Sequence, residues 1–408
     1  MAELLTLESL FTLFMLILLQ AVLGFDNLLY IAIESNKVGD PEQAKKVRKW
    51  GIAIAVLLRI VLLFIIVSLF GALAAPLFDL HLGNITLQHG ETVIFDCIEF
   101  NASLSWIDVI SDLAFLVMDL EQRNQTVYAN QLVNQYIEHT GDYQGIALLQ
   151  FYKAYRAMVR AKVAILSLQV INDQQTTNEQ LANAELQANN NRLLMDRFHQ
   201  YAALANRYTT PPTPFILVMH GFSGSGKSHI SQSLAEQLGA IRIRTDVERK
   251  RLFSFHATAN TESPVDGGIY TSQATEKTYQ HVAGLASVLL KGMVPVVIDG
   301  ANLKHWQRQL FSEIAKDHDV PFTIISCHAD SHILQDRIVQ RAARPSQDKE
   351  RDASEAKLET LAHQQRFSDP LSNEEFGVSI QVNTGQSNRI SSIVEQINKC
   401  LNINTKLV

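Results

Sequence analysis

One stretch decides the fold: "FILVMHGFSGSGKSHISQSLAEQLG", Phe215 to Gly239. Its first six residues are apolar except the last and predict a buried strand of a parallel sheet. From Ser228 onward the pattern predicts an amphipathic helix that ends at Gly239. The segment between them, Gly221–Ser228, fits G-x4-G-K-S, the pattern (Walker A) of a P-loop. The stretch therefore predicts an α/β P-loop NTPase domain with a parallel sheet.

This loop is expected to bind ATP with Mg²⁺. The backbone N–H groups of such a loop wrap the phosphates, and the N-terminal dipole of the next helix adds to anion binding. The Lys227 ammonium is expected to reach the outer phosphates and the Ser228 hydroxyl to hold the metal. The predicted nucleotide-binding residues are Gly221, Phe222, Ser223, Gly224, Ser225, Gly226, Lys227, Ser228 and His229.

Two more carboxylates follow predicted strands. Asp246 comes after "IRIR", where it can orient or deprotonate an acceptor hydroxyl, and Arg249 follows at one helical turn. The alternative for Asp246 is a helix N-cap. Asp299 ends the apolar run "VPVVID" and is predicted to hold the magnesium shell together with Ser228.

A third group is a run of arginines after the predicted strand "FTIISCHAD". Arg337, Arg341 and Arg344 are four and three residues apart and share one helical face. They suit a lid that brings guanidinium groups to phosphate charge, and a solvated basic face is the alternative. "GVSIQVNTG" and "ISSIVEQINKCL" supply a last strand and a last helix.

Residues 215–408 resemble the small P-loop kinases of the polynucleotide-kinase, zeta-toxin and gluconate-kinase type, and the ATP-binding half of bifunctional aminoglycoside-phosphotransferase/ATP-binding proteins. The resemblance rests on the P-loop, the Asp246 and Arg249 pair, Asp299 and the arginine helix. It implies an ATP-dependent kinase whose catalytic residues are Lys227, Asp246, Arg249, Arg341 and Arg344. The acceptor, a small molecule or a polynucleotide end, stays open.

The amino-terminal part of the chain differs from the rest in having two long apolar runs. Two apolar runs, Leu10 to Ile33 and Gly51 to Ala75, are each long enough to cross about 30 Å of hydrocarbon. They predict a two-helix transmembrane hairpin, residues 1–78, with membrane contact through residues 10–75. In a hairpin, Asp26 and Arg59 lie at similar depth, roughly 11 Å from one end at the usual helical rise. Asp26 is either a candidate ion site or half of a structural ion pair.

The stretches "LLQAVLGFDNLLYIAIES" and "VRKWGIAIAVLLRIVLL" resemble the start of the TerC family of integral membrane proteins. The resemblance covers about the first 77 residues and implies metal-ion or tellurium handling. It places the chain at a bacterial inner membrane, with the P-loop domain expected in the cytoplasm. The basic loop between the two runs would instead put both ends outside, so a fusion with a join near Leu77 is a further hypothesis.

The next segment, residues 79–168, predicts a partial kinase lobe. Asp79, Asn84 and Asp96 have the order and spacing of a catalytic base and two magnesium ligands, with the hairpin pattern "NITLQHGETVIFD" around them. The segment resembles the mostly helical C-terminal half of an aminoglycoside-phosphotransferase-like kinase. It lacks that family's amino-terminal lobe and its bracing His, so we expect the lobe to be inactive.

Residues 169–214 predict a helical linker, either a solvated helix or a helical hairpin, that ends in the stiff "TTPPTP", Thr209 to Pro214. A net charge of -6 and a pI near 6.1 argue against a stable nucleic-acid complex. Three widely spaced cysteines suggest neither disulfides nor a zinc site. Two function classes therefore compete: an ATP-dependent kinase, and a TerC-type membrane protein with a regulatory nucleotide domain.

Overall fold

The computed structural model describes residues 84–88, 91–94, 107–173, 184–386 apart from short gaps at 258, 260, 262, 265, 344–353 and 355, and 390–401. The chain divides into two compact units, Met1–Leu77 and Phe78–Val408. All described residues belong to the second unit, so both predicted membrane runs, with Asp26 and Arg59, lie outside them. Among the described helices, none is both long and apolar enough to span a membrane.

The centre of the second unit is a five-stranded sheet. Its strands are β3 (Ile216–His220), β4 (Ile241–Arg244), β5 (Val296–Asp299), β6 (Phe322–His328) and β7 (Ser379–Asn383). Their order is β4-β5-β3-β6-β7, and every neighbouring pair is parallel. This arrangement confirms the parallel α/β sheet predicted from the sequence.

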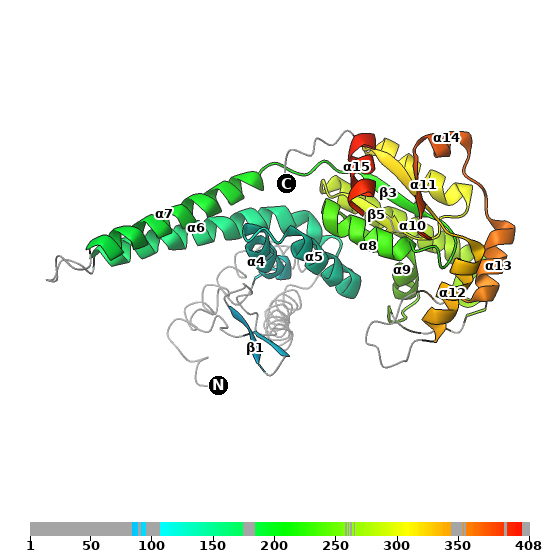
Figure 1. Ribbon diagram of the computed structural model, residues 1–408, viewed down its shortest axis with the longest axis horizontal. Coiled ribbons are helices and arrows are strands. Elements are labelled where there is room, and N and C mark those ends of the chain that lie inside the picture. Colours follow the sequence, from blue (N-terminus) through cyan, green and yellow to red (C-terminus); the bar gives the residue numbers. More distant parts are fainter. Residues whose placement is uncertain are drawn as a thin grey trace, which may run out of the picture. The chain divides into compact units, whose positions relative to one another are not determined.

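Helices cover both faces of this sheet (Figure 1). The helices of this part of the chain are α8 (Lys227–Leu238), α9 (Thr245–Leu252), α10 (Ser272–Lys291), α11 (His305–Asp317), α12 (Ser331–Ala342), α13 (Leu358–Phe367), α14 (Asn373–Gly377) and α15 (Ile390–Cys400), with the short 3₁₀ turn η5 (Gly268–Tyr270). Alternate strand residues point to opposite faces. Leu217 packs with α8 and α15, whereas Val218 packs with α10 and α11.

A helical region, residues 107–208, precedes the sheet region, residues 215–401. It contains α4 (Val109–Gln122), α5 (Thr126–Thr140), the 3₁₀ turn η4 (Gly145–Leu148), α6 (Leu149–Asp173) and α7 (Ala184–Arg207). The end of α7 is not a solvated linker, because Tyr201, Leu204 and Ala205 pack on Phe115 of α4 and Ala157 of α6.

The helical region and the sheet region share one hydrophobic core. Val133 and Ile137 of α5 lie in the same buried cluster as Ile241 and Ile243 of β4. Burial of such side chains contributes roughly 1.5–3 kcal/mol each. The sequence did not predict this packing, which fixes α5 against the strand that precedes Asp246.

A short antiparallel hairpin, β1 (Ile85–Gln88) with β2 (Glu91–Ile94), confirms the hairpin pattern predicted there. Asn84 immediately precedes β1 and is buried, whereas Asp79 and Asp96 lie outside the described residues.

Candidate functional site

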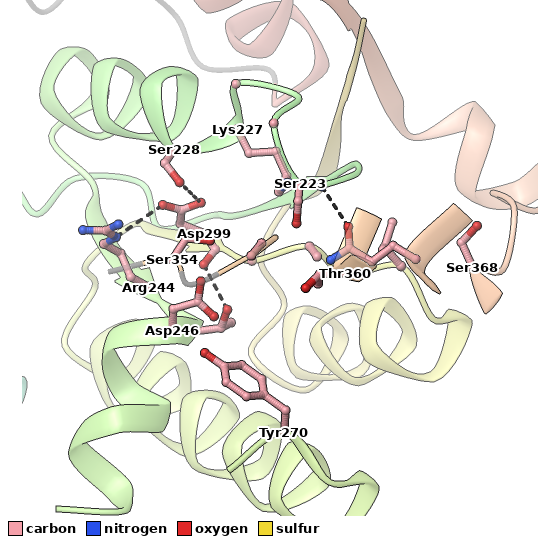
Figure 2. A pocket seen from close by; sticks show the side chains of 18 of the residues that line it. Ser223, Lys227, Ser228, Arg244, Asp246, Tyr270, Asp299, Ser354, Thr360 and Ser368 are labelled. Atoms are coloured by element: carbon pink, nitrogen blue, oxygen red, sulfur yellow. Dashed lines mark hydrogen bonds and ion pairs between the residues drawn. The ribbon is translucent and has the colours of Figure 1, made fainter. Parts of the chain in front are cut away.

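The predicted P-loop connects β3 to α8 and borders a cavity of about 840 Å³ (Figure 2). Ser223, Gly224, Gly226, Lys227, Ser228 and His229 line the cavity. The remaining residues of the predicted loop, Gly221, Phe222 and Ser225, are not among its lining residues. The buried Ser225 Oγ has no hydrogen-bond partner.

Two glycines let the loop take its shape. Gly221 has φ 140°, and a Cβ there would lie 2.2 Å from the carbonyl oxygen of Cys327 on β6. Gly226 has φ 79° and is the N-cap of α8, where no side chain caps the helix. Since L-residues with a side chain disfavour positive φ, both positions favour glycine. The first N–H groups of α8 are consequently available to an anion.

Lys227 curls back over the loop. Its Nζ donates a hydrogen bond to the carbonyl oxygen of Phe222 at 2.7 Å. Burial lowers the pKa of the Lys227 ammonium, against the opposing effect of the nearby Cys327, Asp299 and Asp246. An ammonium beside the first N–H groups of α8 is suited to a bound phosphate.

Ser228 and Asp299 lie together at the ends of neighbouring elements. The Ser228 hydroxyl donates to Asp299 Oδ1 at 3.4 Å, as Figure 2 shows. Asp299 is 5% exposed, and its Oδ2 atom makes no hydrogen bond. A buried carboxylate oxygen without a donor is costly, so it marks a site that a cation can complete.

Two arginines of β4 flank the same carboxylate. Arg242 Nη1 lies 4.0 Å and Arg244 Nε 3.7 Å from Asp299 Oδ2. The parallel register places Arg244 opposite Asp299, which explains why a guanidinium reaches it. These ion pairs are longer than hydrogen bonds.

Both arginines bind Glu138 of α5 more closely. Arg242 Nη2 lies 3.0 Å from Glu138 Oε2, and Arg244 Nη1 lies 2.6 Å from Glu138 Oε1. Burial alone would raise the pKa of the Glu138 carboxyl, but Arg244 and Arg242 outweigh it and hold the pKa below its usual range. Sequence reasoning missed Glu138. The sequence does contain a pattern that could have indicated it: three polar residues lie four residues apart on one helical face, Asn130, Asn134 and Glu138.

Asp246 lies at the start of α9 and lines the cavity together with Tyr270 (Figure 2). The helix begins at Thr245, and its N-cap is Arg244, so Asp246 does not occupy the N-cap position. The structure thus brings Asp246 to the same cavity as Lys227, Ser228 and Asp299.

Arg249 also borders the cavity, but its hydrogen bonds go to the protein. It is 5% exposed, and its Nη1 donates to the carbonyl of Ile269 at 2.8 Å and to Thr275 Oγ1 at 3.1 Å. Its guanidinium also lies 4.9 Å from the ring centroid of Tyr270. These contacts brace η5 and the start of α10 around the cavity.

The arginine helix is α12, and it ends at Ala342. Arg337 donates to the carbonyl oxygens of Gly224 at 3.2 Å and Thr384 at 2.7 Å, which ties the P-loop to the end of β7. Arg341 lines the cavity and donates to the carbonyl of Ala356 at 2.8 Å. Arg344 lies outside the described residues.

A further cavity wall comes from α13, which was not among the predicted site elements. The Ser223 N–H donates to Gln364 Oε1 at 2.8 Å, so α13 is attached directly to the P-loop. Thr360 and His363 of the same helix line the cavity. The sequence "LETLAHQQRF" gave no signal for this role, since it reads as an ordinary amphipathic helix.

Two family models match the chain. One, described as an AAA domain, matches residues 216–371, which cover β3 to the loop beyond α13. The other, the integral membrane protein TerC family, matches residues 5–99. The TerC match passes the join predicted near Leu77 and includes Asp79, Asn84 and Asp96. The resemblance of residues 79–168 to a kinase lobe stays a prediction.

Uncharacterized proteins of Mycobacterium tuberculosis and Mycobacterium bovis are 30% identical to this chain over 264 residues, 65% of this chain and 49% of theirs. The chain thus spans about half the length of the curated relatives it matches.

Solved structures resemble about half of the chain. A gluconokinase from Sinorhizobium meliloti is 19% identical, covers 47% of this chain and 93% of its own, and has a TM-score of 0.33. The APS kinase CysC of Mycobacterium tuberculosis is 16% identical, covers 47% of this chain and 99% of its own, and has a TM-score of 0.30. These values are too low to carry a substrate over to this chain.

Proposed function

We propose that the sheet region is an ATP-dependent kinase, which transfers the terminal phosphoryl group of ATP to the hydroxyl of a small molecule or a polynucleotide end. One observation carries the proposal. A single cavity is lined both by a loop suited to phosphates, with Lys227 and Ser228, and by a carboxylate suited to a hydroxyl, Asp246. A protein that only senses a nucleotide has no need of the second group.

The loop fits the phosphates of ATP. It offers the uncapped N-terminus of α8 and the Lys227 ammonium, in a loop conformation that Gly221 and Gly226 permit. The cavity beside the loop has a volume of about 840 Å³, which lies in the range of pockets for small molecules.

The pair of Ser228 and Asp299 fits Mg²⁺. A hydroxyl and a carboxylate within 3.4 Å of each other supply oxygen ligands, and Asp299 Oδ2 has no hydrogen bond that a cation must break. No cluster of three or more His, Cys, Asp or Glu side chains suited to a metal occurs in the described part of the chain. Mg²⁺ does not need such a cluster, since it is usually held by one or two carboxylates, phosphates and water. When bound, the metal neutralises charge on the phosphate oxygens.

The chemical step assigns a role to each remaining side chain. Asp246 accepts the proton of the acceptor hydroxyl as that oxygen forms a bond to the terminal phosphorus and the bond to the ADP oxygen breaks. Lys227 and Arg341 stabilise the negative charge on the phosphoryl group during transfer. Arg249 holds the cavity wall rather than the phosphate, and a catalytic role for Arg344 stays a prediction.

The test is a transfer screen with the full chain and γ-labelled ATP against sugars, nucleosides and polynucleotide 5′-hydroxyl ends. We expect one class of acceptor to be labelled by the wild type. Asp246→Asn should lower the transfer rate about 10²- to 10⁴-fold, the usual contribution of a positioned base, with ATP affinity unchanged. Asp317→Asn, an exposed carboxylate at the end of α11, is the matched control.

Two outcomes would contradict the proposal. Full transfer activity in Asp246→Asn would remove this carboxylate from the reaction. ATP binding by the wild type with no transfer to any acceptor class would remove the kinase itself.

The second outcome would favour a TerC-type membrane protein in metal-ion or tellurium handling, regulated by the nucleotide domain. The match of residues 5–99 to the TerC family supports this alternative. In that case Asp26 is the candidate ion site, and ATP would alter ion transport without being consumed by an acceptor.

A further inference from the structure

The contact between α5 and β4 brings a carboxylate of the helical region to the arginines beside the proposed metal pair. Glu138 binds Arg242 at 3.0 Å and Arg244 at 2.6 Å, one carboxylate oxygen for each guanidinium. Such charge-assisted hydrogen bonds are strong when partly buried, and both arginine side chains are at most 15% exposed.

The same two arginines could bind Asp299 instead. Their nearest nitrogens lie 4.0 and 3.7 Å from Asp299 Oδ2, too far for a hydrogen bond. The cluster thus holds two guanidinium groups and two carboxylates. Both arginines make short contacts with Glu138, and Arg242 Nη1 also donates to the Ser228 carbonyl at 3.2 Å, whereas one oxygen of Asp299 has no hydrogen bond.

The position of Glu138 is fixed by its own helix. Asn134, one turn earlier, accepts a hydrogen bond from the Arg242 N–H at 2.8 Å and donates to the carbonyl of Ala240 at 3.0 Å. Asn130, another turn earlier, donates to the carbonyl of Glu236 on α8 at 2.7 Å. Side chains four residues apart thus attach one face of α5 both to β4 and to α8, the helix that follows the P-loop.

We propose that Glu138 is a positioning residue for the metal site: its carboxylate holds Arg242 and Arg244 away from Asp299 and so leaves Asp299 able to bind Mg²⁺. Without this negative charge, both arginines still face the carboxylate of Asp299, at 4.0 and 3.7 Å. They then turn to it, and their positive charges compete with the divalent cation. The inference rests on the proposed use of Asp299 by Mg²⁺, but it does not need phosphoryl transfer to occur.

The experiment measures binding of a fluorescent ATP analogue to the full chain at graded Mg²⁺ concentrations and in EDTA. Mg²⁺ is expected to strengthen binding of the analogue. In Glu138→Gln we expect that reaching half of this increase takes about tenfold more Mg²⁺ than in the wild type, because one unit of nearby negative charge is lost. Binding in EDTA should stay equal or become tighter, because the site is more positive. A merely structural role would weaken binding in both conditions.

Three further variants complete the design. Glu138→Asp keeps the charge and should restore most of the wild-type Mg²⁺ dependence, even if Glu138→Gln folds poorly. Glu138→Gln combined with Arg242→Gln restores the charge balance and should shift the Mg²⁺ dependence back toward the wild type. Glu313→Gln, an exposed glutamate on α11 bound to Gln309, is the matched control.

An unchanged Mg²⁺ dependence in Glu138→Gln, or an equal loss of affinity with and without Mg²⁺, would overturn the inference. The outcomes distinguish this inference from the kinase proposal. A wild type that binds the analogue in a Mg²⁺-dependent way but transfers no phosphate would disprove the kinase and leave the role of Glu138 intact. A wild type that binds no nucleotide would overturn both.

Discussion

The helical region and the sheet region treat their buried charges in opposite ways. In the helical region, Lys153 binds Glu121 at 2.7 Å, and Tyr208 donates its hydroxyl hydrogen to the other oxygen of Glu121. At the end of β5 in the sheet region, by contrast, the buried Oδ2 atom of Asp299 has no hydrogen-bond partner.

This difference separates structural from functional polar groups. A satisfied buried network stabilises one arrangement of helices, and nothing else needs to bind it. Buried oxygens without a hydrogen-bond partner also occur in the helical region, at Gln150 and Asn191, but of these three residues only Asp299 lines the cavity. The cavity of the sheet region, not the charged cluster between α4, α6 and α7, is therefore where we propose that the chemistry occurs.

The largest expected effect comes from disrupting the buried ion pair of the helical region, Lys153 with Glu121. Lys153→Ala leaves Glu121 as a buried carboxylate without its cation, and it should lower the free energy of unfolding by about 3–5 kcal/mol. The measurement is urea unfolding of the full chain in detergent, followed by circular dichroism. The ATP affinity of the folded protein should not change, because the cluster lies outside the cavity.

The matched control for this prediction is Lys162→Ala, an exposed lysine on the same helix, which should change the stability by less than about 0.5 kcal/mol. If Lys153→Ala were as stable as Lys162→Ala, the charged cluster of the helical region would not be a structural element.

A smaller effect is expected within the sheet region. This region also has a buried charged network whose hydrogen bonds are complete, between Arg308 and Glu375. Arg308 is buried, and its Nε and Nη2 donate to Glu375 at 2.7 and 3.0 Å. Burial alone would raise the pKa of the Glu375 carboxyl, but the hydrogen bonds from Arg308 and from the Ser372 N–H lower it to about 2.

A folded-state pKa below the ordinary value of 4.5 means that the ionised form stabilises the fold. This contribution is fully present above pH 4.5 and is lost as the pH falls toward 2. Glu375→Gln should therefore be less stable than the wild type near neutral pH and should lose less stability between pH 4.5 and 2 in acid unfolding. Glu374→Gln, its exposed neighbour, should follow the wild type. Parallel acid profiles for wild type and Glu375→Gln would contradict the lowered pKa.

Local sequence patterns predicted the strands and the ends of the strands well. Apolar runs followed by Gly or Asp mark buried parallel strands, and the carboxyl ends of such strands meet at one edge of the sheet. Hence the P-loop, Asp246 and Asp299 could be expected to meet, and they do line one cavity.

Local sequence patterns did not predict the partners of the charged side chains. An arginine suits a phosphate and a backbone carbonyl equally, because both accept hydrogen bonds. Arg249 was therefore expected to be catalytic and Arg337 to approach phosphate, although both donate to carbonyl oxygens. Glu138 was missed because Arg244 lies 106 residues away in the chain, and no local period reports such a contact.

The most direct test of the central claim, that Asp299 at the end of β5 forms a metal and nucleotide site with the P-loop, is calorimetric titration of ATP into the full chain with and without Mg²⁺. For the wild type we predict that Mg²⁺ tightens binding. In Asp299→Asn this coupling should fall by about tenfold or more, with Mg²⁺-free affinity retained. Undiminished Mg²⁺ coupling in Asp299→Asn would contradict the assignment of the site.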